Sequence, residues 1–452
     1  MIREVYKEFK LIKPLLYRFL LIIGASFGGA VLSIPIVLGI VLYDLSKSDF
    51  KSVFIVFVVV LLFSDSNSPL FSTSGGNTKD LILILIVLFL IFKGKMYIQF
   101  SYLKYFALYI LVAFIGLFLS NFSLIGLQKL LSYTLVILVV PVLLFLIFDK
   151  GDGLVFLKQL ILIFAFFYGF SILMSRINPA VFAQFGRFNG IHRNPNGVGI
   201  FSTLFVMNMF LIKDKLPNIF SKKMFYTLVS IFIFAIVISG SRNAMISLGI
   251  FAGFRFLRVR FFIGLIIILV LAFSYNFILL QLEELVVAAN LEKELRLDTL
   301  SYASGRIYIW QACWMEIQNN FYFGHGFSYE EYSKWDRAYV KILPMLIHNY
   351  GNIHNSYLTI WLNTGLIGLI AYLIGLFVYT IKFQFKSLWL APFIFSALFM
   401  AFFESYMVAS LNPYTWQLWF AFFIVTVSFK PSVFSNKNPK ESAMTKEIPS
   451  MY

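Results

Sequence analysis

Long blocks of consecutive apolar residues recur along the chain, and short polar or basic stretches separate them. The clearest blocks cover 81–92, 130–148, 154–174 and 261–280. Several approach the ~20 apolar residues that a helix needs to cross a bilayer. They do not alternate between apolar and polar positions, as the strands of a membrane β-barrel must. The pattern therefore predicts an all-α polytopic membrane protein.

The composition agrees with this fold class. Of the 452 residues, 60% are hydrophobic and 13% are charged, whereas soluble proteins carry ~25% charged residues. The apolar stretch after the basic start of the chain has no small-residue cleavage site, so we expect no cleaved signal peptide. The single cysteine, Cys313, excludes an intrachain disulfide and a cysteine-based metal cluster.

The net charge of +16 comes largely from basic residues in short loops between the apolar blocks. This is the positive-inside pattern of cytoplasmic loops, and it argues against nucleic-acid binding. The basic segments are 3–18, 93–104, 213–223, 255–260, 382–386 and the tail from 430.

Counting apolar segments between these loops predicts about 12 spans, with both termini in the cytoplasm. The block 15–45 is too long for one upright span and contains Gly24, Gly28 and Gly29, so it forms either a re-entrant hairpin or two short crossings. The other predicted spans are 53–63, 81–92, 105–119, 130–148, 154–174, 197–212, 224–238, 243–257, 261–280, 356–381, 388–411 and 414–429.

Residues 281–353 form the longest polar stretch and carry nine of the chain's 21 acidic residues. This acidity contrasts with the basic loops and favours an outside location. Helical patterning at 281–299 and 305–318 indicates a small folded cap. The expected organisation is a transmembrane bundle at 1–280, a periplasmic cap at 281–353, further transmembrane helices at 354–429 and a disordered cytoplasmic tail at 430–452.

Four polar clusters fall on the outer side of this topology. All four histidines of the chain, His192, His325, His348 and His354, lie on that side as well. The clusters are 187–196, 239–243, 304–306 together with 324–326, and 354–355.

The arginines of these clusters have two interpretations. Arg187 and Arg193 are either interfacial side chains that extend to the membrane surface or parts of a site. Arg242 lies in a turn between two apolar spans that is too short to be a solvated loop. An arginine there costs several kcal/mol unless it is paired or functional, so we expect a functional role. Asn194-Pro195-Asn196 has the composition of a turn that starts the next helix.

The histidines differ in what their positions indicate. His354, beside Asn355, directly precedes an apolar helix and follows the cap, which favours a functional role over a simple helix start. His325 lies between two glycines and is either a turn residue or a site residue. His192 and His348 are expected to be surface residues.

Two further features fall within the apolar C-terminal part. Gly365 and Gly368 are expected to allow close helix packing. Glu404 lies inside an apolar span, where an acidic residue is either functional or paired with a buried arginine.

These residue types favour one kind of chemistry. Arginines bind phosphate oxygens bidentately, and a histidine can take a proton from an attacking hydroxyl near neutral pH. The four histidines lack the carboxylate spacing of a zinc site, and we find no phosphate-binding glycine loop. The set is suited to group transfer from a lipid diphosphate to an alcohol.

Three sequence motifs that contain these residues resemble those of a known protein family. His354-Asn355 is followed by nine residues and then Gly365-Leu-Ile-Gly368, and Arg187-x-x-Gly190 by four residues and then Pro195-Asn196. Ser239-Gly-Ser-Arg242 is the third. With the 304–326 region, which resembles the start of a large periplasmic loop, they make the sequence similar to the O-antigen ligase and O-antigen polymerase superfamily. The resemblance covers roughly 175–380, and 1–170 matches only as a generic bundle of spans.

The resemblance implies a glycosyltransferase of GT-C-like fold in the bacterial inner membrane, with a periplasmic active site and neither metal nor cofactor. The donor would be an oligosaccharide linked to undecaprenyl diphosphate. Arg187 and Arg242 would hold the diphosphate, and His354 would act as general base or orient the acceptor hydroxyl. Further substrate-binding candidates are Arg306 and His325 on the acceptor side, with Asn355, Asn196, Arg193 and Glu404.

The acceptor stays open at this point. A polymerase would extend another lipid-linked repeat unit, a ligase would use lipid A-core, and some relatives glycosylate proteins. We favour a polymerase because no feature for lipid A-core or a protein acceptor is recognisable, and a chain-length regulator and a flippase would then be further partners. A transporter would show inverted repeats and polar residues at the membrane midplane, which this sequence does not suggest.

Overall fold

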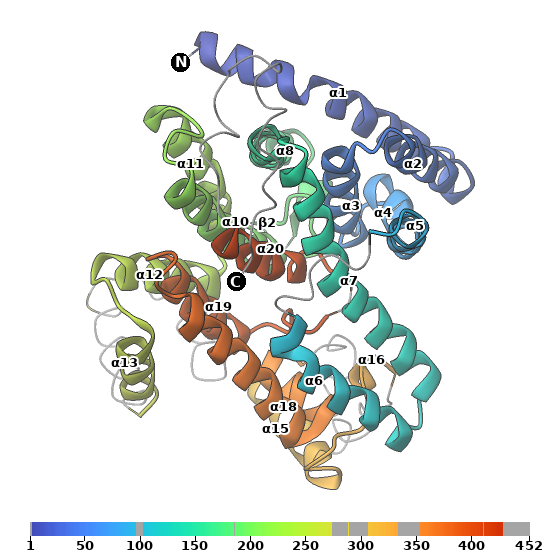
Figure 1. Ribbon diagram of the computed structural model, residues 1–452. Coiled ribbons are helices and arrows are strands. Elements are labelled where there is room, and N and C mark those ends of the chain that lie inside the picture. The colour runs from blue at the N-terminus through green and yellow to red at the C-terminus, as the bar shows by residue number, and fades with distance from the viewer. Residues whose placement is uncertain are drawn as a thin grey trace, which may run out of the picture. The chain divides into compact units, whose positions relative to one another are not determined.

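The computed structural model describes residues 2–95, 103–184, 186–273, 288, 306–332, 353–409 and 411–427. Within these ranges the protein is helical apart from one antiparallel pair of short strands, β1 (Ala183–Gln184) and β2 (Arg187–Phe188). This confirms the predicted all-α polytopic class (Figure 1). The chain forms two compact units. The first unit comprises Met1–Phe100, Leu135–Ile246 and Leu411–Tyr452, and the second Ser101–Thr134 and Ser247–Ser410.

The first unit contains most of the helices. They are α1 (Ile2–Ser26), α2 (Gly29–Ser46), α3 (Phe50–Ser64), α4 (Pro69–Gly75), α5 (Thr78–Phe92), α8 (Gly153–Ile177), α9 (Pro179–Phe182), α10 (Pro195–Lys215), α11 (Lys222–Ser239) and α20 (Thr415–Thr426). Two helices pass from one unit to the other, α7 (Ser123–Asp149) and α12 (Arg242–Phe256).

The core of the first unit is built around helices that are apolar on all sides. Every residue of α3 from Val53 to Phe63 is buried, as expected for a helix without a polar face. Trp416 of α20 packs edge-on against Phe54 of α3, at 5.8 Å between ring centroids. On α10, Asn208 donates a hydrogen bond of 3.2 Å to the Gln417 carbonyl and so links α10 to α20.

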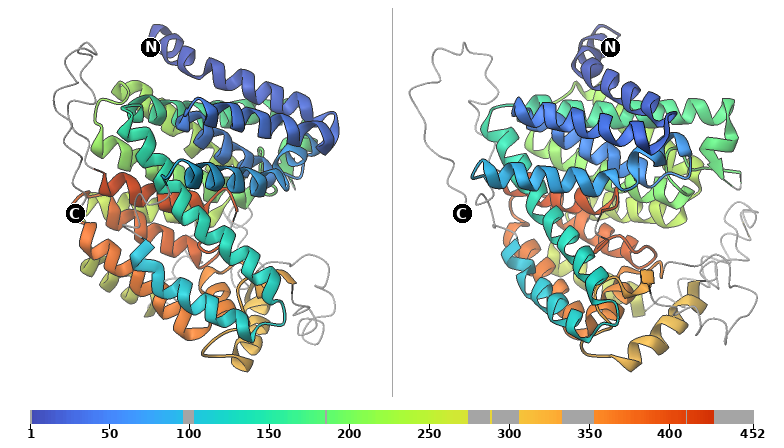
Figure 2. Two further views of the ribbon diagram at one scale, coloured as in Figure 1. Left: turned by 45° about the vertical axis from the view of Figure 1, so that its right-hand side comes forward. Right: turned by 90° about the vertical axis from the view of Figure 1, so that its right-hand side faces the viewer.

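The second unit contains α6 (Leu103–Gly116), the 3₁₀ turn η1 (Leu117–Leu119), α13 (Phe261–Phe273), α15 (Arg306–Asn319), α16 (Tyr329–Tyr332), α18 (Ser356–Phe383) and α19 (Leu390–Ala401). α6 lies along α18 (Figure 2). Gly375 permits this approach, because a Cβ there would come 2.2 Å from the Tyr105 carbonyl oxygen.

α18 is broken one third of the way along its length. Gly365 has φ +68° and ψ −178°, which no helix contains. The segment 321–326 supplies backbone partners at the break. The amides of His325 and Gly326 donate to the carbonyls of Leu362 and Asn363 at 2.8 and 2.9 Å, and the Leu366 amide donates to the Phe321 carbonyl at 2.9 Å. Gly365 does allow a close approach, as predicted, but the partner is the 321–326 backbone rather than another helix, and the glycine also interrupts α18.

Among the described residues, seven helical stretches are long and apolar enough to cross a membrane. They are Gly29–Ser46, Pro69–Phe92, Ser123–Asp149, Gly153–Ile177, Pro195–Lys215, Lys222–Ser239 and Ser356–Phe383. Shorter apolar helices lie at Phe50–Ser64, Leu103–Leu119, Leu390–Ala401 and Thr415–Thr426. The count of about 12 spans stays a prediction.

Several predicted boundaries change. The block 15–45 is two helices that pack on each other, α1 and α2, with Gly29 at φ +73° where α2 begins. The predicted span 388–411 is too long, because α19 ends at Ala401 and Glu404 lies in the loop beyond it. The predicted helix at 305–318 is confirmed as α15. The predicted helix at 281–299, apart from residue 288, lies outside the described residues, as do His348 and the tail from 430.

Candidate active site

Three candidate residues of the second unit meet at one carboxylate. Oε1 of Glu404 lies 2.8 Å from Nη2 of Arg306, and Oε2 lies 3.2 Å from Nδ1 of His354. Nη1 of Arg306 also donates to the carbonyl of Phe403. The side chains of Glu404 and Arg306 are 7% and 13% exposed, whereas that of His354 is 24% exposed. The carboxylate is thus buried between two cationic or potentially cationic groups, and the imidazole is accessible from outside.

The charges around Glu404 keep it ionised. Burial alone would raise the pKa of this carboxyl, but the Arg306 charge and the hydrogen bond from His354 outweigh burial, so its pKa lies below the ordinary value. An ionised carboxylate at this place favours the imidazole tautomer in which Nδ1 carries the proton and donates it.

The start of α18 holds His354 in a constrained backbone conformation. Its φ is +52°, a value that residues other than glycine rarely adopt. Asn355 caps the helix by accepting from the amides of Tyr357 and Leu358 at 2.9 and 3.0 Å. The backbone amide of Asn355 donates to the Ser405 hydroxyl at 2.9 Å. Strained residues that are fixed on both sides are typical of functional sites.

A second hydroxyl fixes the same loop to the helix. Ser356 donates to the Glu404 carbonyl at 2.6 Å and accepts from the amide of Tyr406 at 3.2 Å. The backbone that carries Glu404 is therefore bonded directly to the helix start that carries His354. Asn355, predicted to bind substrate, acts here as a cap and a tether.

In the first unit, Arg187 connects the two other predicted clusters. Its Nε donates to the Ser239 carbonyl at 2.7 Å, and its Nη2 donates to Oδ1 of Asn196 at 3.2 Å. Gly240 ends α11 in the left-handed conformation, with φ +59°. A Cβ at Gly240 would lie 3.3 Å from Nε of Arg187, so the glycine leaves room for the guanidinium.

Arg242 follows this turn as the first residue of α12 and is half-buried. Arg242 thus begins α12 directly after the tight turn between two apolar helices, whereas the prediction placed it within the turn. Arg187 thus contacts the turn that leads into Arg242. Asn194 is the N-cap of α10 and accepts from the Gly197 amide at 2.9 Å, as predicted. Arg193 is exposed, and its carbonyl accepts from Nδ2 of Asn67.

A buried polar network beside this loop was not predicted. His192 is 1% exposed, so the expectation of a surface histidine is wrong. Its Nδ1 lies 2.9 Å from Oδ2 of Asp65, and its Nε2 lies 2.7 Å from the hydroxyl of Tyr168. Tyr414 donates to the same Asp65 oxygen. Tyr168 lies in α8, Asp65 directly follows α3 and Tyr414 directly precedes α20. Through His192 they hold the 187–196 loop in place.

His325 is buried, and both of its ring nitrogens form hydrogen bonds within the protein. Its Nε2 donates to the Glu316 carbonyl at 2.9 Å, and its Nδ1 accepts from Nδ2 of Asn320 at 3.1 Å. Its ring also stacks on Tyr329 at 4.4 Å. This geometry favours the turn-residue interpretation, and the function proposed below gives His325 no chemical role.

The described residues contain no group of three or more His, Cys, Asp or Glu side chains placed to hold a metal ion. What they contain are two sets of basic side chains in a polytopic membrane protein, Arg187 with Arg242 in the first unit and Arg306 with His354 in the second. A carboxylate accompanies the second set.

Comparison with known families gives a match over part of the chain. Residues 227–373 match the family model described as O-antigen ligase. The match includes Arg242, Arg306, His325, His354 and Asn355, and it confirms the resemblance to the O-antigen ligase and polymerase superfamily of membrane glycosyltransferases. No curated protein matches the chain.

Proposed function

We propose that the protein transfers a glycan from undecaprenyl diphosphate to a sugar hydroxyl on the periplasmic side of the bacterial inner membrane, as the polymerase of a surface polysaccharide. The observation that carries the proposal is the Glu404 carboxylate between Arg306 and His354. His354 and Arg306 lie within the family match, and Glu404 follows it in the chain.

The proposed reaction is a displacement at the anomeric carbon. The acceptor oxygen bonds to that carbon, the bond from the carbon to the diphosphate oxygen breaks, and the diphosphate leaves with the electron pair. The acceptor proton passes to Nε2 of His354. The Glu404 carboxylate at Nδ1 then stabilises the imidazolium that forms. Arg306 neutralises Glu404 before the transfer and keeps it in place.

In this proposal, Arg187 and Arg242 bind the diphosphate of the glycan donor. A guanidinium matches a diphosphate with two parallel hydrogen bonds, and its charge does not depend on pH. Fixed cations at a leaving group stabilise the negative charge that develops there. A divalent metal ion has this role in other glycosyl transfers. The proposal is therefore for a metal-independent enzyme.

The test is His354→Ala in cells that lack the chromosomal copy. We expect polymer to disappear from the surface glycan pattern on a gel, since general-base assistance contributes roughly 10²–10⁴-fold to rate. An immunoblot of the membrane fraction should show the normal protein level. Lys382→Gln is the control, because Lys382 lies in the last turn of the same helix, and this variant should produce normal polymer. Normal polymer from His354→Ala would refute the proposal.

The description of the matched family as a ligase favours one second candidate, transfer of finished glycan to lipid A-core. A deletion strain separates the two. Loss of a polymerase leaves single repeat units on the core. Loss of a ligase leaves bare core, while lipid-linked polymer accumulates.

A further inference from the structure

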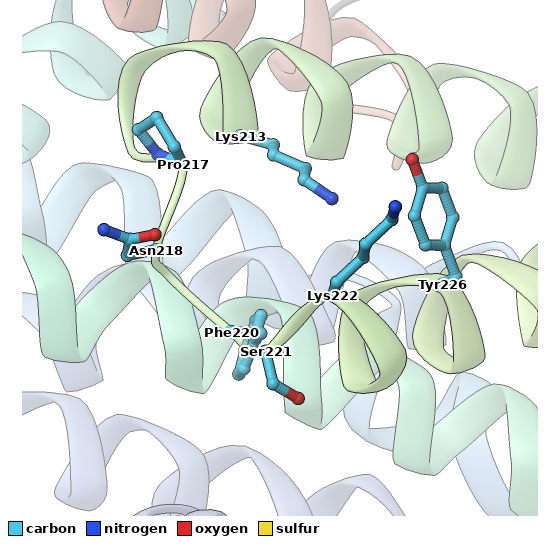
Figure 3. Close-up of a pocket in the computed structure, with 7 residues that line it drawn as sticks. All are labelled: Lys213, Pro217, Asn218, Phe220, Ser221, Lys222 and Tyr226. Carbon is cyan, nitrogen blue, oxygen red and sulfur yellow. The ribbon is translucent and has the colours of Figure 1, made fainter.

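The loop between α10 and α11 lines an open cavity of about 500 Å³ in the first unit. Its lining includes Lys213 from the end of α10, Lys222 and Tyr226 from the start of α11, and Asn218 and Ser221 from the loop. Figure 3 shows Lys213 and Lys222 extending toward each other from the two helices, with the hydroxyl of Tyr226 beside them. The cavity is far along the helices from the cluster of Arg187.

The two lysines place two positive charges at the cavity, and the Glu4 carboxylate lies at its edge, hydrogen-bonded to Ser221. Among the residues that the structure describes, neither ammonium has a carboxylate within ion-pairing distance. Lys213 is half-buried and lies over the rings of Phe225 and Tyr226, 3.9 and 4.4 Å from their centroids. Cation–π contacts hold an ammonium in place without neutralising it. Two like charges that face one cavity repel, and an anion between them would relieve that repulsion.

The polar groups at the helix start are already engaged. Glu4 of α1 accepts from the Ser221 amide at 3.3 Å and from the Ser221 hydroxyl at 2.9 Å, and Ser221 caps α11 by accepting from the Met224 amide. Recognition in the cavity therefore depends on the lysines, on the Tyr226 hydroxyl and on the Asn218 side chain. Two ammonium groups with a hydroxyl donor suit a phosphate, which has several acceptor oxygens and a full negative charge.

We propose that this cavity binds the phosphate of a phosphorylated ligand, and that the ligand is the headgroup of an anionic phospholipid. Lys213 and Lys222 lie in one of the basic segments that the positive-inside pattern assigns to the cytoplasmic side, where anionic lipids attract basic residues. The ends of two apolar helices form the cavity, so a headgroup there would leave its acyl chains beside α10 and α11. A soluble phosphate compound shares the same chemistry and is the other source to be distinguished.

Binding would hold together the ends of α10 and α11 opposite to the catalytic arginine. Pro195–Lys215 has 21 residues, and at 1.5 Å per residue the helix is about 30 Å long. Asn196, the partner of Arg187, lies at one end of α10 and Lys213 lies at the other. The site is thus separate from the proposed chemistry, and its loss leaves the residues of that chemistry intact.

The experiment measures binding to the full-length protein purified in a neutral detergent. The probes are short-chain phosphatidylglycerol, short-chain phosphatidylcholine and glycerol phosphate, and native mass spectrometry or calorimetry gives each Kd. The test variant is Lys213→Gln/Lys222→Gln. The matched control is Lys10→Gln/Lys13→Gln, which removes the same charge from α1 on the same predicted side. Melting temperature shows that each variant is folded.

We expect phosphatidylglycerol to bind the natural protein more tightly than phosphatidylcholine does. The test variant should weaken this binding by about 10-fold or more, in keeping with the contribution of each lysine to binding anionic lipid, and the control variant by less than about 2-fold. Glycerol phosphate that binds as tightly as the lipid would identify a soluble ligand of the same chemistry. Unchanged phosphatidylglycerol binding in the test variant, an equal loss in the control, or no binding of any phosphate probe would overturn the proposal.

Discussion

Nδ1 of His354 lies 3.2 Å from Oε2 of Glu404, although 50 residues separate them in the chain. The pair explains why an acidic residue occurs in a strongly apolar region. Glu404 is held by Arg306 on one side and presents its other oxygen to the imidazole. His354 is therefore oriented by a charged partner that the fold itself neutralises.

Glu404→Gln tests this orientation. The amide keeps the shape but loses the charge, so Arg306 is left partly buried without a counter-ion. We expect the free energy of unfolding to fall by about 3 kcal/mol and glycan transfer to fall by about 100-fold or more. Thermal unfolding in detergent and the surface glycan pattern measure the two effects.

Glu331→Gln is the control for Glu404→Gln, because Glu331 forms an exposed pair with Lys129 at 2.8 Å. Exposed pairs contribute about 0–1 kcal/mol, so at neutral pH this variant should keep the natural protein's glycan transfer and, to within about 1 kcal/mol, its stability. The pH profile adds a second check. Because the pKa of Glu404 is lowered, its pairing stabilises the fold above the ordinary pKa and is lost as pH falls through the lowered value. Equal acid sensitivity in Glu404→Gln would contradict the pairing.

Glu330 should give a pH dependence of the opposite sign. Burial, and then the charge of Glu331, raise the pKa of Glu330 from 4.5 to about 7. Between these values the folded protein holds a proton that the unfolded chain releases, so stability falls as pH rises through this window. Glu330→Gln should flatten the melting temperature between pH 5 and about 8. A natural protein whose melting temperature rises over that range would contradict the prediction.

Arg242→Lys keeps the charge and removes the planar fork of donors. If Arg242 binds a diphosphate bidentately, we expect at least about 10-fold less polymer at a normal protein level, since lysine cannot replace both hydrogen bonds. Arg176→Lys is the control, because Arg176 lies in the last turn of α8. Full activity of Arg242→Lys would argue against a diphosphate clamp.

Gly365→Ala should prevent normal folding. The new Cβ would lie 2.1 Å from the Tyr322 carbonyl oxygen, and alanine is strained at φ +68°. We expect a loss of several kcal/mol and little protein in the membrane fraction. Gly249→Ala in α12 is the matched control, since its Cβ would meet nothing within 4 Å. Equal accumulation of the two variants would show that the break in α18 is not needed.

The elements were predictable where apolar blocks are long. The segments 130–148, 154–174, 197–212 and 224–238 correspond to α7, α8, α10 and α11, because bilayer thickness and hydrophobicity dictate them locally. The end of α19 was not predictable. Residues 402–411 stay mostly apolar, and the helix stops there because the loop bonds to Ser356 and Asn355 instead.

The candidate site was predictable in its residue types and less so in its contacts. His354 and Arg306 stand out by sequence, and pairing with a buried arginine was one of two interpretations for Glu404. Hydropathy does not reveal which arginine is the partner, because 98 residues separate the pair. His192 was misplaced for a similar reason. It sits in a polar run, but its partners Asp65 and Tyr414 lie 127 and 222 residues away.

The break at Gly365 also bears on how this part of the protein folds. A continuous helix satisfies its backbone hydrogen bonds internally, whereas α18 depends at its break on partners from another segment. The partners at 321–326 are synthesised earlier than the segment that needs them. The backbone hydrogen bonds at the break in α18 are therefore complete only when a segment that precedes it in the chain packs there, so the start of this helix and the segment 321–326 form together.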